Sequence, residues 1–252
     1  MSVVIPAYNE STRLEKTVHS IWRYLDRAGV VFEIIVVDDG SADDTAAIAQ
    51  RLGQQLGRLR VIRLPVNSGK GAAVKTGMLA ATGDYVLFTD ADESTSIEQL
   101  PRLLRPLAGG FDLAIGSRGA PGATIVHGQG WLRQNLGKAA GLLIRVLLVR
   151  GYADSQCGFK CFRRAAVDVI FPRVTVTSAL FDIELLILAG RAGLRVAEVP
   201  VTWVHDPDTR LPYNFRRAVG TFVELLRLRY RWRVWRPVNV RAVRIGATPN
   251  RI

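Results

Sequence analysis

Short runs of Val, Ile and Leu alternate with longer amphipathic segments as far as residue 115, and this alternation limits the fold more than any other feature. Near-continuous apolar strands separated by helices are typical of a parallel sheet covered on both faces. We therefore predict a doubly wound, mostly parallel α/β core. The expected strands are 3–5, 33–37, 60–64, 85–89 and 113–115, and the expected helices are 14–25, 45–56, 72–81 and 97–107.

Polar clusters follow three of the expected strands, and ligands of such sheets bind beyond the carboxyl ends of the strands. The clusters are Pro6-Ala7-Tyr8-Asn9-Glu10, Asp38-Asp39-Gly40-Ser41 and Asp90-Ala91-Asp92. We expect all three to face one crevice. Taken alone, the second cluster is also typical of a turn that caps the following helix.

Asp90 and Asp92 are one residue apart, and alternate residues of an extended chain point the same way. Their carboxylates can therefore converge on one Mg²⁺ or Mn²⁺ ion, both of which prefer oxygen ligands. A cation held there would act as a Lewis acid on a leaving diphosphate. The alternative for this pair is a solvated turn.

Residues 67–71, Asn-Ser-Gly-Lys-Gly, precede an expected helix. Their backbone N–H groups and the Lys70 side chain could face a phosphate, although a capped helix start explains them equally well. The glycine spacing and the following Ser or Thr of a P-loop are absent from this motif.

Charge is divided unevenly along the 252 residues. The first 112 residues hold 12 Lys and Arg against 14 Asp and Glu, whereas the remainder hold 22 against 8. A basic second half indicates an anionic partner, either a lipid surface or nucleic acid. We disfavour nucleic acid because it leaves the acidic strand ends unexplained.

The chain shows no membrane-spanning or secretory signal. Its best apolar stretch, Ala139 to Val149, is short and contains Arg145, and residues 2–6 begin a strand rather than a signal peptide. We expect a cytoplasmic protein, peripheral at the cytoplasmic face of a membrane. Cys157 and Cys161 lack partners for a zinc site and are expected to be free, packed thiols.

The pattern after residue 115 is less regular. We expect a mobile Gly-rich loop at 116–130, helices at 136–149 and 180–192, and a strand at 195–204. We divide the chain into a domain at 1–210 and a basic, aromatic-containing extension at 211–252. The segments 136–149 and 222–235 fit core packing and docking on an anionic membrane surface equally well.

Four motifs in order resemble the family 2 glycosyltransferases of the GT-A fold. They are residues 4–10, 36–45, 67–71 and 83–92. Three further motifs, at 115–118, 154–160 and 181–184, are similar to those of the polyprenyl-phosphate hexosyltransferases, and Gln-Cys-Gly-Phe-Lys at 156–160 looks closest to the dolichyl-phosphate β-glucosyltransferases. The resemblance covers residues 2 to about 210.

This resemblance implies roles for individual residues. The metal would lie on Asp90 and Asp92, and Asp182 would lie near the donor sugar, although Asp182 and Glu184 also fit ordinary surface acids. Relatives sometimes place a Gln where this chain has Ser94, so a third protein ligand is in doubt. The nucleotide-sugar contacts would be Pro6, Ala7, Tyr8, Glu10, Asp38, Asp39, Lys70 and Ala91, and the acceptor-phosphate contacts Ser117, Arg118 and Arg133.

The predicted function is inverting transfer of a hexose, glucose from UDP-glucose, onto polyprenyl phosphate. A phosphate oxygen is already ionised at neutral pH and needs no strong base, and an arginine fork can hold it in line with the leaving UDP. The alternatives are a soluble transferase with a nonlipid acceptor, such as a glycerate-type acid, and a polyprenyl-phosphate mannosyltransferase that uses GDP-mannose.

Overall fold

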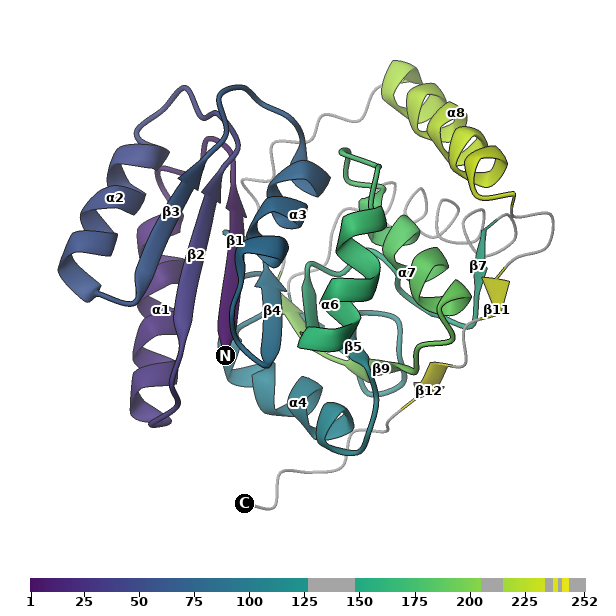
Figure 1. The fold of residues 1–252 in the computed structure, drawn as a ribbon, viewed down its shortest axis with the longest axis horizontal. Coiled ribbons are helices and arrows are strands. Elements are labelled where there is room, and N and C mark those ends of the chain that lie inside the picture. Colours follow the sequence, from purple (N-terminus) through teal and green to yellow (C-terminus); the bar gives the residue numbers. More distant parts are fainter. Residues whose placement is uncertain (127–147, 205–214, 234–237, 240–241, 245–252) are drawn as a thin grey trace.

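The computed structural model describes residues 1–126, 148–204, 215–233, 238–239 and 242–244. Helices cover both faces of a central sheet (Figure 1). In the described residues this sheet has eight strands in the order β12-β9-β5-β8-β4-β1-β2-β3. Two short pairs, β10 with β6 and β11 with β7, lie outside it.

The element bounds follow the sequence pattern closely through the first half. The strands are β1 Ser2–Ala7, β2 Glu33–Asp38, β3 Leu59–Arg63, β4 Tyr85–Thr89, β5 Leu113–Ser117, β6 Thr124–Val126, β7 Val149–Arg150, β8 Phe159–Arg163, β9 Val196–Pro200, β10 Thr202–Val204, β11 Val238–Asn239 and β12 Ala242–Arg244. The α-helices are α1 Leu14–Arg27, α2 Thr45–Leu56, α3 Lys70–Ala80, α4 Leu100–Ala108, α6 Arg164–Ile170, α7 Phe181–Arg191 and α8 Phe215–Arg231, and the 3₁₀ turns are η1 Ile97–Gln99 and η2 Phe171–Arg173.

Alternate residues of the strands enter two separate cores. In β1, Val3 and Ile5 pack with α1, α2 and α4, whereas Val4 packs with α3, α6 and α7 on the opposite face. Successive side chains of a strand point to opposite faces, so a strand that is apolar throughout needs cover on both sides. This arrangement confirms the predicted doubly wound α/β core.

One strand of the main sheet runs against its neighbours. β8 lies between β4 and β5 and is antiparallel to both, whereas β1, β2, β3 and β4 pair in parallel. The start of β8 therefore lies beside the carboxyl end of β4, where Thr89 pairs with Phe159. This register brings the motif at 156–160 next to Asp90.

The second half departs from the predicted elements in several places. The expected strand at 195–204 is two strands, β9 and β10, because the chain leaves the main sheet after Pro200 and pairs instead with β6. The expected loop at 116–130 contains the end of β5 and β6, and its last residues lie outside the described part. Most of the expected helix at 136–149 also lies outside the described residues, and its last residue begins β7.

The segment after residue 215 packs on the main body. Leu225 and Leu228 of α8 belong to the same apolar core as α7, and β12 pairs in parallel with β9. The predicted boundary near residue 210 lies outside the described residues, and the division into two parts remains a prediction. Among the helices described, none is long and apolar enough to cross a membrane.

Candidate active site

The loops that follow β1 and β2 are joined by hydrogen bonds. The Asn9 amide donates to Ser41 Oγ at 2.9 Å, and the Glu10 amide donates to Thr45 Oγ1 at 2.7 Å. In return, Ala42 donates its amide to Asn9 Oδ1 at 2.9 Å. Two of the predicted polar clusters thus form one connected rim, with Tyr8 half exposed beside it.

The two aspartates that end β2 are buried but differ in their partners. Asp38 Oδ1 accepts the Ser41 amide at 3.1 Å. Asp38 Oδ2 lies 3.1 Å from Arg63 Nε, an ion pair, but it accepts no hydrogen bond from the described residues. A buried carboxylate oxygen with spare capacity to accept is suited to an N–H of a base or a hydroxyl of a ribose. Asp38 therefore fits the predicted nucleotide contact.

Asp39 organises the neighbouring loop. Its Oδ1 accepts the Ser68 amide at 2.7 Å and its Oδ2 accepts the Gly69 amide at 2.8 Å. The Gly71 amide donates to the Thr177 carbonyl at 2.7 Å. Of the two alternatives for this motif, the one in which these amides face a phosphate was therefore wrong, because tertiary partners occupy them. The Lys70 side chain extends toward Asp90.

The conformation of this loop explains one of its glycines. Gly69 has a φ of 97°, and a Cβ there would collide with the Thr177 carbonyl oxygen. Only glycine combines that φ with so close an approach of a second backbone. The segment 176–178 thereby fixes the position at which α3 begins.

The centre of the site is a group of charges at the end of β4. Lys70 Nζ contacts Asp90 Oδ1 at 2.6 Å, and Asp92 accepts the Ser94 amide at 2.9 Å. Burial, and then the neighbouring Asp90 charge, raise the pKa of Asp92. Burial acts to lower the pKa of Lys70, but the charges of Asp90 and Asp182 outweigh it and raise that pKa.

Carboxylate oxygens are ligands that Mg²⁺ and Mn²⁺ prefer, so the chemistry of Asp90 and Asp92 suits the predicted cation, and its binding there stays a prediction. Asp90 already binds one cationic group, and its negative charge adds to the effect of burial in raising the pKa of Asp92. The described residues contain no group of three or more His, Cys, Asp or Glu side chains that could hold a metal. Mg²⁺ or Mn²⁺ would therefore complete its coordination with water and donor phosphates, as Mg²⁺ usually does.

Asp182 and Glu184 are both buried, so the alternative that they are surface acids was wrong. Lys160 is also buried, and its Nζ contacts Asp182 Oδ1 at 2.5 Å and the Cys157 carbonyl at 2.7 Å. Asp182 lies close enough to Lys70 to alter its pKa, which places it at the edge of the charged centre.

Glu184 stabilises the fold. Its Oε2 accepts the amides of Thr175 and Val176, and its Oε1 accepts the Thr175 hydroxyl and Trp232 Nε1, all at 2.7 Å. It thereby connects α7, the segment before it and the end of α8.

Gly158 and Lys160 are site residues to which sequence analysis assigned no role. The Gly158 carbonyl accepts the Asp90 amide at 3.1 Å, and a Cβ on Gly158 would overlap the Asp90 carboxylate. The motif that contains them, residues 154–160, resembles that of a known family. Their roles could be assigned only once the structure showed that β8 lies against β4. The pairing of distant strands is not visible in local sequence.

The predicted acceptor residues are only partly described. Arg118 binds Asp154 in a fork, with Nε to Oδ2 at 2.6 Å and Nη2 to Oδ1 at 3.0 Å, and its guanidinium stacks over Trp203. Ser117 is buried and its hydroxyl accepts the amides of Gly119 and Ala120, so it shapes the turn. Arg133 lies outside the described residues.

The two cysteines are buried and free, as predicted. Burial raises the pKa of Cys157 to about 11 and that of Cys161 to about 12. Both thiols are therefore protonated and unreactive at neutral pH.

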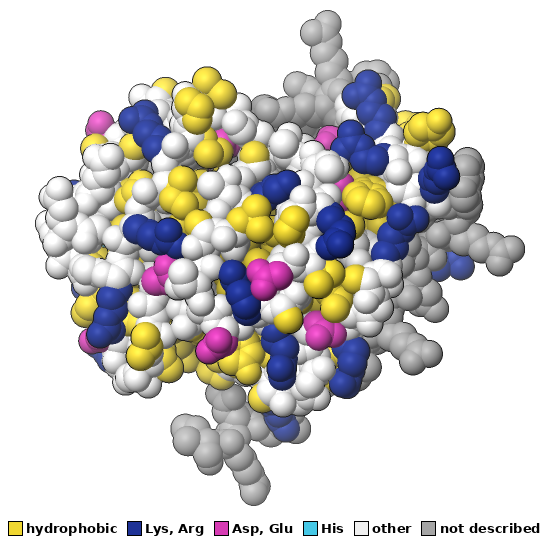
Figure 2. Space-filling model, viewed as in Figure 1, with side chains coloured by type: hydrophobic (Ala, Val, Ile, Leu, Met, Phe, Trp, Pro, Cys, Tyr) yellow, Lys and Arg dark blue, Asp and Glu magenta, His cyan; other side chains and the backbone are white. Residues whose placement is uncertain are grey.

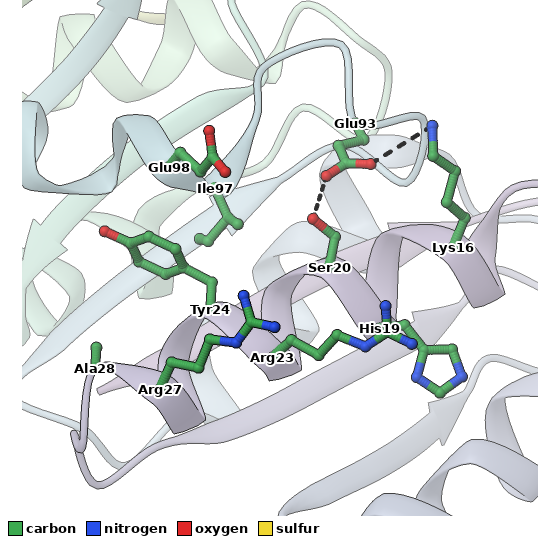
Figure 3. A pocket seen from close by; sticks show the side chains of 10 residues that line it. All are labelled: Lys16, His19, Ser20, Arg23, Tyr24, Arg27, Ala28, Glu93, Ile97 and Glu98. Atoms are coloured by element: carbon green, nitrogen blue, oxygen red, sulfur yellow. Dashed lines mark hydrogen bonds and ion pairs between the residues drawn. The ribbon is translucent and has the colours of Figure 1, made fainter.

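Two hollows lie beside α1, on the outer side of the charged centre. The larger, of about 870 Å³, runs along the α1 side chains in Figure 3, where Ser20 and Lys16 point toward Glu93. The second, of about 630 Å³, shares Lys16 and Glu93 with it and reaches Asp92. Of the predicted site residues, only Asp92 lines either hollow.

Comparison with known proteins agrees with this geometry. The pattern described as "Glycosyl transferase family 2" matches residues 2–171. The chain is similar to dolichyl-phosphate beta-glucosyltransferase of Homo sapiens, with 33% identity over 250 residues that cover 94% of this chain and 77% of that protein. The protein of the same name from Saccharomyces cerevisiae is 34% identical over 226 residues, covering 82% of this chain and 67% of that protein.

A solved structure shares the fold. It is glucosyl-3-phosphoglycerate synthase from Mycobacterium tuberculosis in complex with Mn²⁺, UDP and phosphoglyceric acid, with a TM-score of 0.67 and 25% identity. The match covers 92% of this chain and 77% of that one. The sheet order, the three polar strand ends and these similarities lead to one conclusion: the chain belongs to glycosyltransferase family 2 and has the GT-A fold.

Proposed function

We propose that this glycosyltransferase moves glucose from UDP-glucose onto polyprenyl phosphate of the dolichyl type, with inversion at the anomeric carbon. The observation that carries the proposal is the charged centre at the end of β4, where Asp90, Asp92, Lys70 and Asp182 lie together. The similarity to dolichyl-phosphate beta-glucosyltransferases over 94% of the chain supports this donor and acceptor.

The donor side uses the rim formed by the first two strand ends. Asp38 has a buried oxygen available to the base or ribose, and its partner in the neighbouring strand is Ala7, within the cluster that holds Pro6, Tyr8 and Glu10. Asp39 contributes by holding the loop that carries Lys70. Asp90 and Asp92 would hold Mg²⁺ or Mn²⁺, which would stabilise the leaving diphosphate as a Lewis acid.

Lys160 keeps Asp182 in place for the sugar. The buried ammonium fixes one carboxylate oxygen of Asp182 at 2.5 Å, so the other oxygen is available to a sugar hydroxyl. Burial raises the pKa of Asp182, and the positive charges of Lys160 and Lys70 act against that rise. An ionised Asp182 can only accept hydrogen bonds, which suits a hydroxyl donor.

The acceptor side uses Arg118. Asp154 binds the Nε and Nη2 edge of the guanidinium and orients it, which leaves Nη1 outside that pair. An acceptor phosphate bound there would place an ionised oxygen against the anomeric carbon. The new bond forms between that oxygen and the carbon while the bond to the UDP oxygen breaks, so no proton must be removed from the nucleophile.

The proposed location is the cytoplasmic face of a membrane, where α8 contacts anionic lipid. Its outer surface exposes Phe222, Val223, Leu226 and Tyr230, with exposed fractions of 38% to 80%. Basic and hydrophobic side chains lie side by side over α8 in Figure 2. Apolar side chains beside arginines are suited to the boundary between lipid tails and phosphates.

Transfer of labelled glucose tests the proposal. Full-length protein should transfer from UDP-glucose with Mn²⁺ to a short polyprenyl phosphate, and Asp92→Asn and Arg118→Ala should each lower kcat/KM by about 100-fold. Asp168→Ala, at a 60% exposed side chain of α6 outside the proposed site, is the control and should leave transfer unchanged. Full activity of Asp92→Asn at saturating donor and acceptor would contradict the metal assignment.

A second candidate has a specific observation in its favour. The solved structure with the same fold is of a protein crystallised with phosphoglyceric acid, a small anion that Arg118 could also bind. Phosphoglyceric acid in place of polyprenyl phosphate distinguishes the two acceptors. Efficient transfer to phosphoglyceric acid, without transfer to polyprenyl phosphate, would contradict the proposed lipid acceptor. Transfer from GDP-mannose, without transfer from UDP-glucose, would contradict the proposed donor.

A further inference from the structure

The ammonium group of Lys70 is held by carboxylates of other elements. Its Nζ contacts Asp90 Oδ1 at 2.6 Å, and the charges of Asp182 and Asp92 also act on it. The Lys70 side chain remains 31% exposed. Because a lysine has a flexible stem of four carbons, this ammonium can move by several ångströms without any movement of α3.

Lys70 occupies an unfavourable place in its own helix. It is the first residue of α3, and the first turn of α3 contains no acidic residue. A positive charge at a helix N-terminus is repelled by the helix dipole, whereas phosphate is attracted there. The contact with Asp90 offsets that repulsion, and a diphosphate would do so as well.

Asp90 cannot satisfy both cations through the same oxygen. A Mg²⁺ or Mn²⁺ ion binds carboxylate oxygen at about 2.1 Å. An ammonium group only 2.6 Å from Asp90 Oδ1 would then lie within a few ångströms of a divalent charge. A metal bound to Oδ1 would therefore displace Lys70, and a metal bound to the other oxygen of Asp90 would be repelled by the nearby ammonium.

We propose that Lys70 is an exchangeable counter-ion, which neutralises Asp90 until the diphosphate of the donor draws it away and leaves Asp90 and Asp92 to the metal. The identity of the donor rests on the proposed function. The consequence is that metal and UDP bind cooperatively through one side chain. Linkage is reciprocal, so each should increase the affinity of the other by the same factor.

Mn²⁺ alone provides the direct test, measured by electron paramagnetic resonance of free Mn²⁺ with full-length protein. Lys70→Met should bind Mn²⁺ at least about tenfold more tightly than wild type in the absence of nucleotide. Lys75→Met is the matched control, because Lys75 lies on the same helix but donates to the Val174 carbonyl rather than to a carboxylate. Its Mn²⁺ affinity should equal that of wild type.

UDP provides the second measurement, by calorimetry with and without Mn²⁺. In wild type, UDP should raise Mn²⁺ affinity by a factor within about 5- to 150-fold. In Lys70→Met that factor should fall below its wild-type value, and only the part that comes from direct coordination of the metal by the diphosphate should remain. Lys70→Arg keeps the charge and should keep the weak Mn²⁺ affinity of wild type.

The outcomes separate this proposal from the proposed function. Equal Mn²⁺ affinity of wild type and folded Lys70→Met overturns the exchange, whether or not UDP binds. If the wild-type protein does not bind UDP, the proposed donor is wrong. The Mn²⁺ affinities still test whether Lys70 exchanges with the metal. Lys70→Gln replaces the Met variant if thermal melting shows that the latter is unfolded, and adding Asp92→Asn to either variant should abolish the gained affinity.

Discussion

Gly158→Ala is the substitution that tests most directly how the site is held. The new Cβ would overlap all three carboxylate atoms of Asp90, whose backbone amide is fixed to the Gly158 carbonyl at 3.1 Å. Gly158 does not have a left-handed φ, so an alanine would be penalised by this collision alone.

The magnitude follows from the size of the overlap. The nearest Asp90 carboxylate oxygen, 2.0 Å from the new Cβ, must move by about 1.4 Å to reach an ordinary contact distance, and a displacement of even about 1 Å can cost about 100-fold in rate. This equals about 2.7 kcal/mol of transition-state stabilisation. Overpacking should also lower the free energy of unfolding by about 1–3 kcal/mol. The midpoint of thermal unfolding should then fall by about 2–4 °C for each kcal/mol.

Two measurements on the same preparations decide the result. Glucose transfer gives kcat/KM, and thermal unfolding gives stability, with Gly220→Ala as the matched control. A Cβ at Gly220 meets nothing within 4 Å, and an alanine within a helix should be neutral or stabilise by about 0.5–1 kcal/mol. If Gly158→Ala retained the kcat/KM of wild type, the carboxylate of Asp90 would not need the position that β8 gives it.

Three further predictions concern stability and reactivity. Glu184→Ala removes the acceptor of four buried or half-buried hydrogen bonds and should cost about 3–5 kcal/mol in urea unfolding, whereas Asp168→Ala, at a 60% exposed carboxylate, should cost less than about 0.5 kcal/mol. Cys157 and Cys161 should resist iodoacetamide at pH 8 until urea unfolds the protein, as read by mass spectrometry; rapid labelling of the native protein would contradict their burial. Burial acts to raise the pKa of Asp43, but hydrogen bonds from Thr45 and Ser11 lower it to about 2, so its contribution to stability is present above about pH 4 and lost as the pH falls toward 2. The difference in melting temperature between wild type and Asp43→Asn should disappear over that interval, and a difference that persisted at pH 2 would exclude the ionised carboxylate as its cause.

The first half of the fold could be predicted because its signals are local. Helix α2 and strand β4 have the predicted bounds, since apolar periodicity and turn residues lie within each segment. The placement of Asp38, Asp39 and Asp90 at one edge of the sheet also followed from a general rule about parallel sheets. The second half lacked such signals. The sequence of β8 does not differ from that of a parallel strand, so its antiparallel direction could not be predicted.

The predicted partners of individual groups were less accurate. A phosphate contact was one of two alternatives for the amides of Ser68 and Gly69, yet both amides bind Asp39, which lies 30 residues from Gly69 in sequence. Asp182 was read either as a sugar contact or as a surface acid, and its burial against Lys160 excludes the second. Such outcomes depend on distances between segments, which periodicity does not encode.

The sequence by itself determined the doubly wound core, the family and the acidic pair at 90 and 92, because each rests on patterns that lie within short segments or on the order of such segments along the chain. Tertiary structure decided what surrounds that pair. Lys70 comes to Asp90 because α3 begins against the segment 176–178, and Gly158 lies beneath Asp90 because β8 runs antiparallel to β4. Ion pairs fall off with distance in space and not along the chain, so only the packed fold could place a cation on this carboxylate.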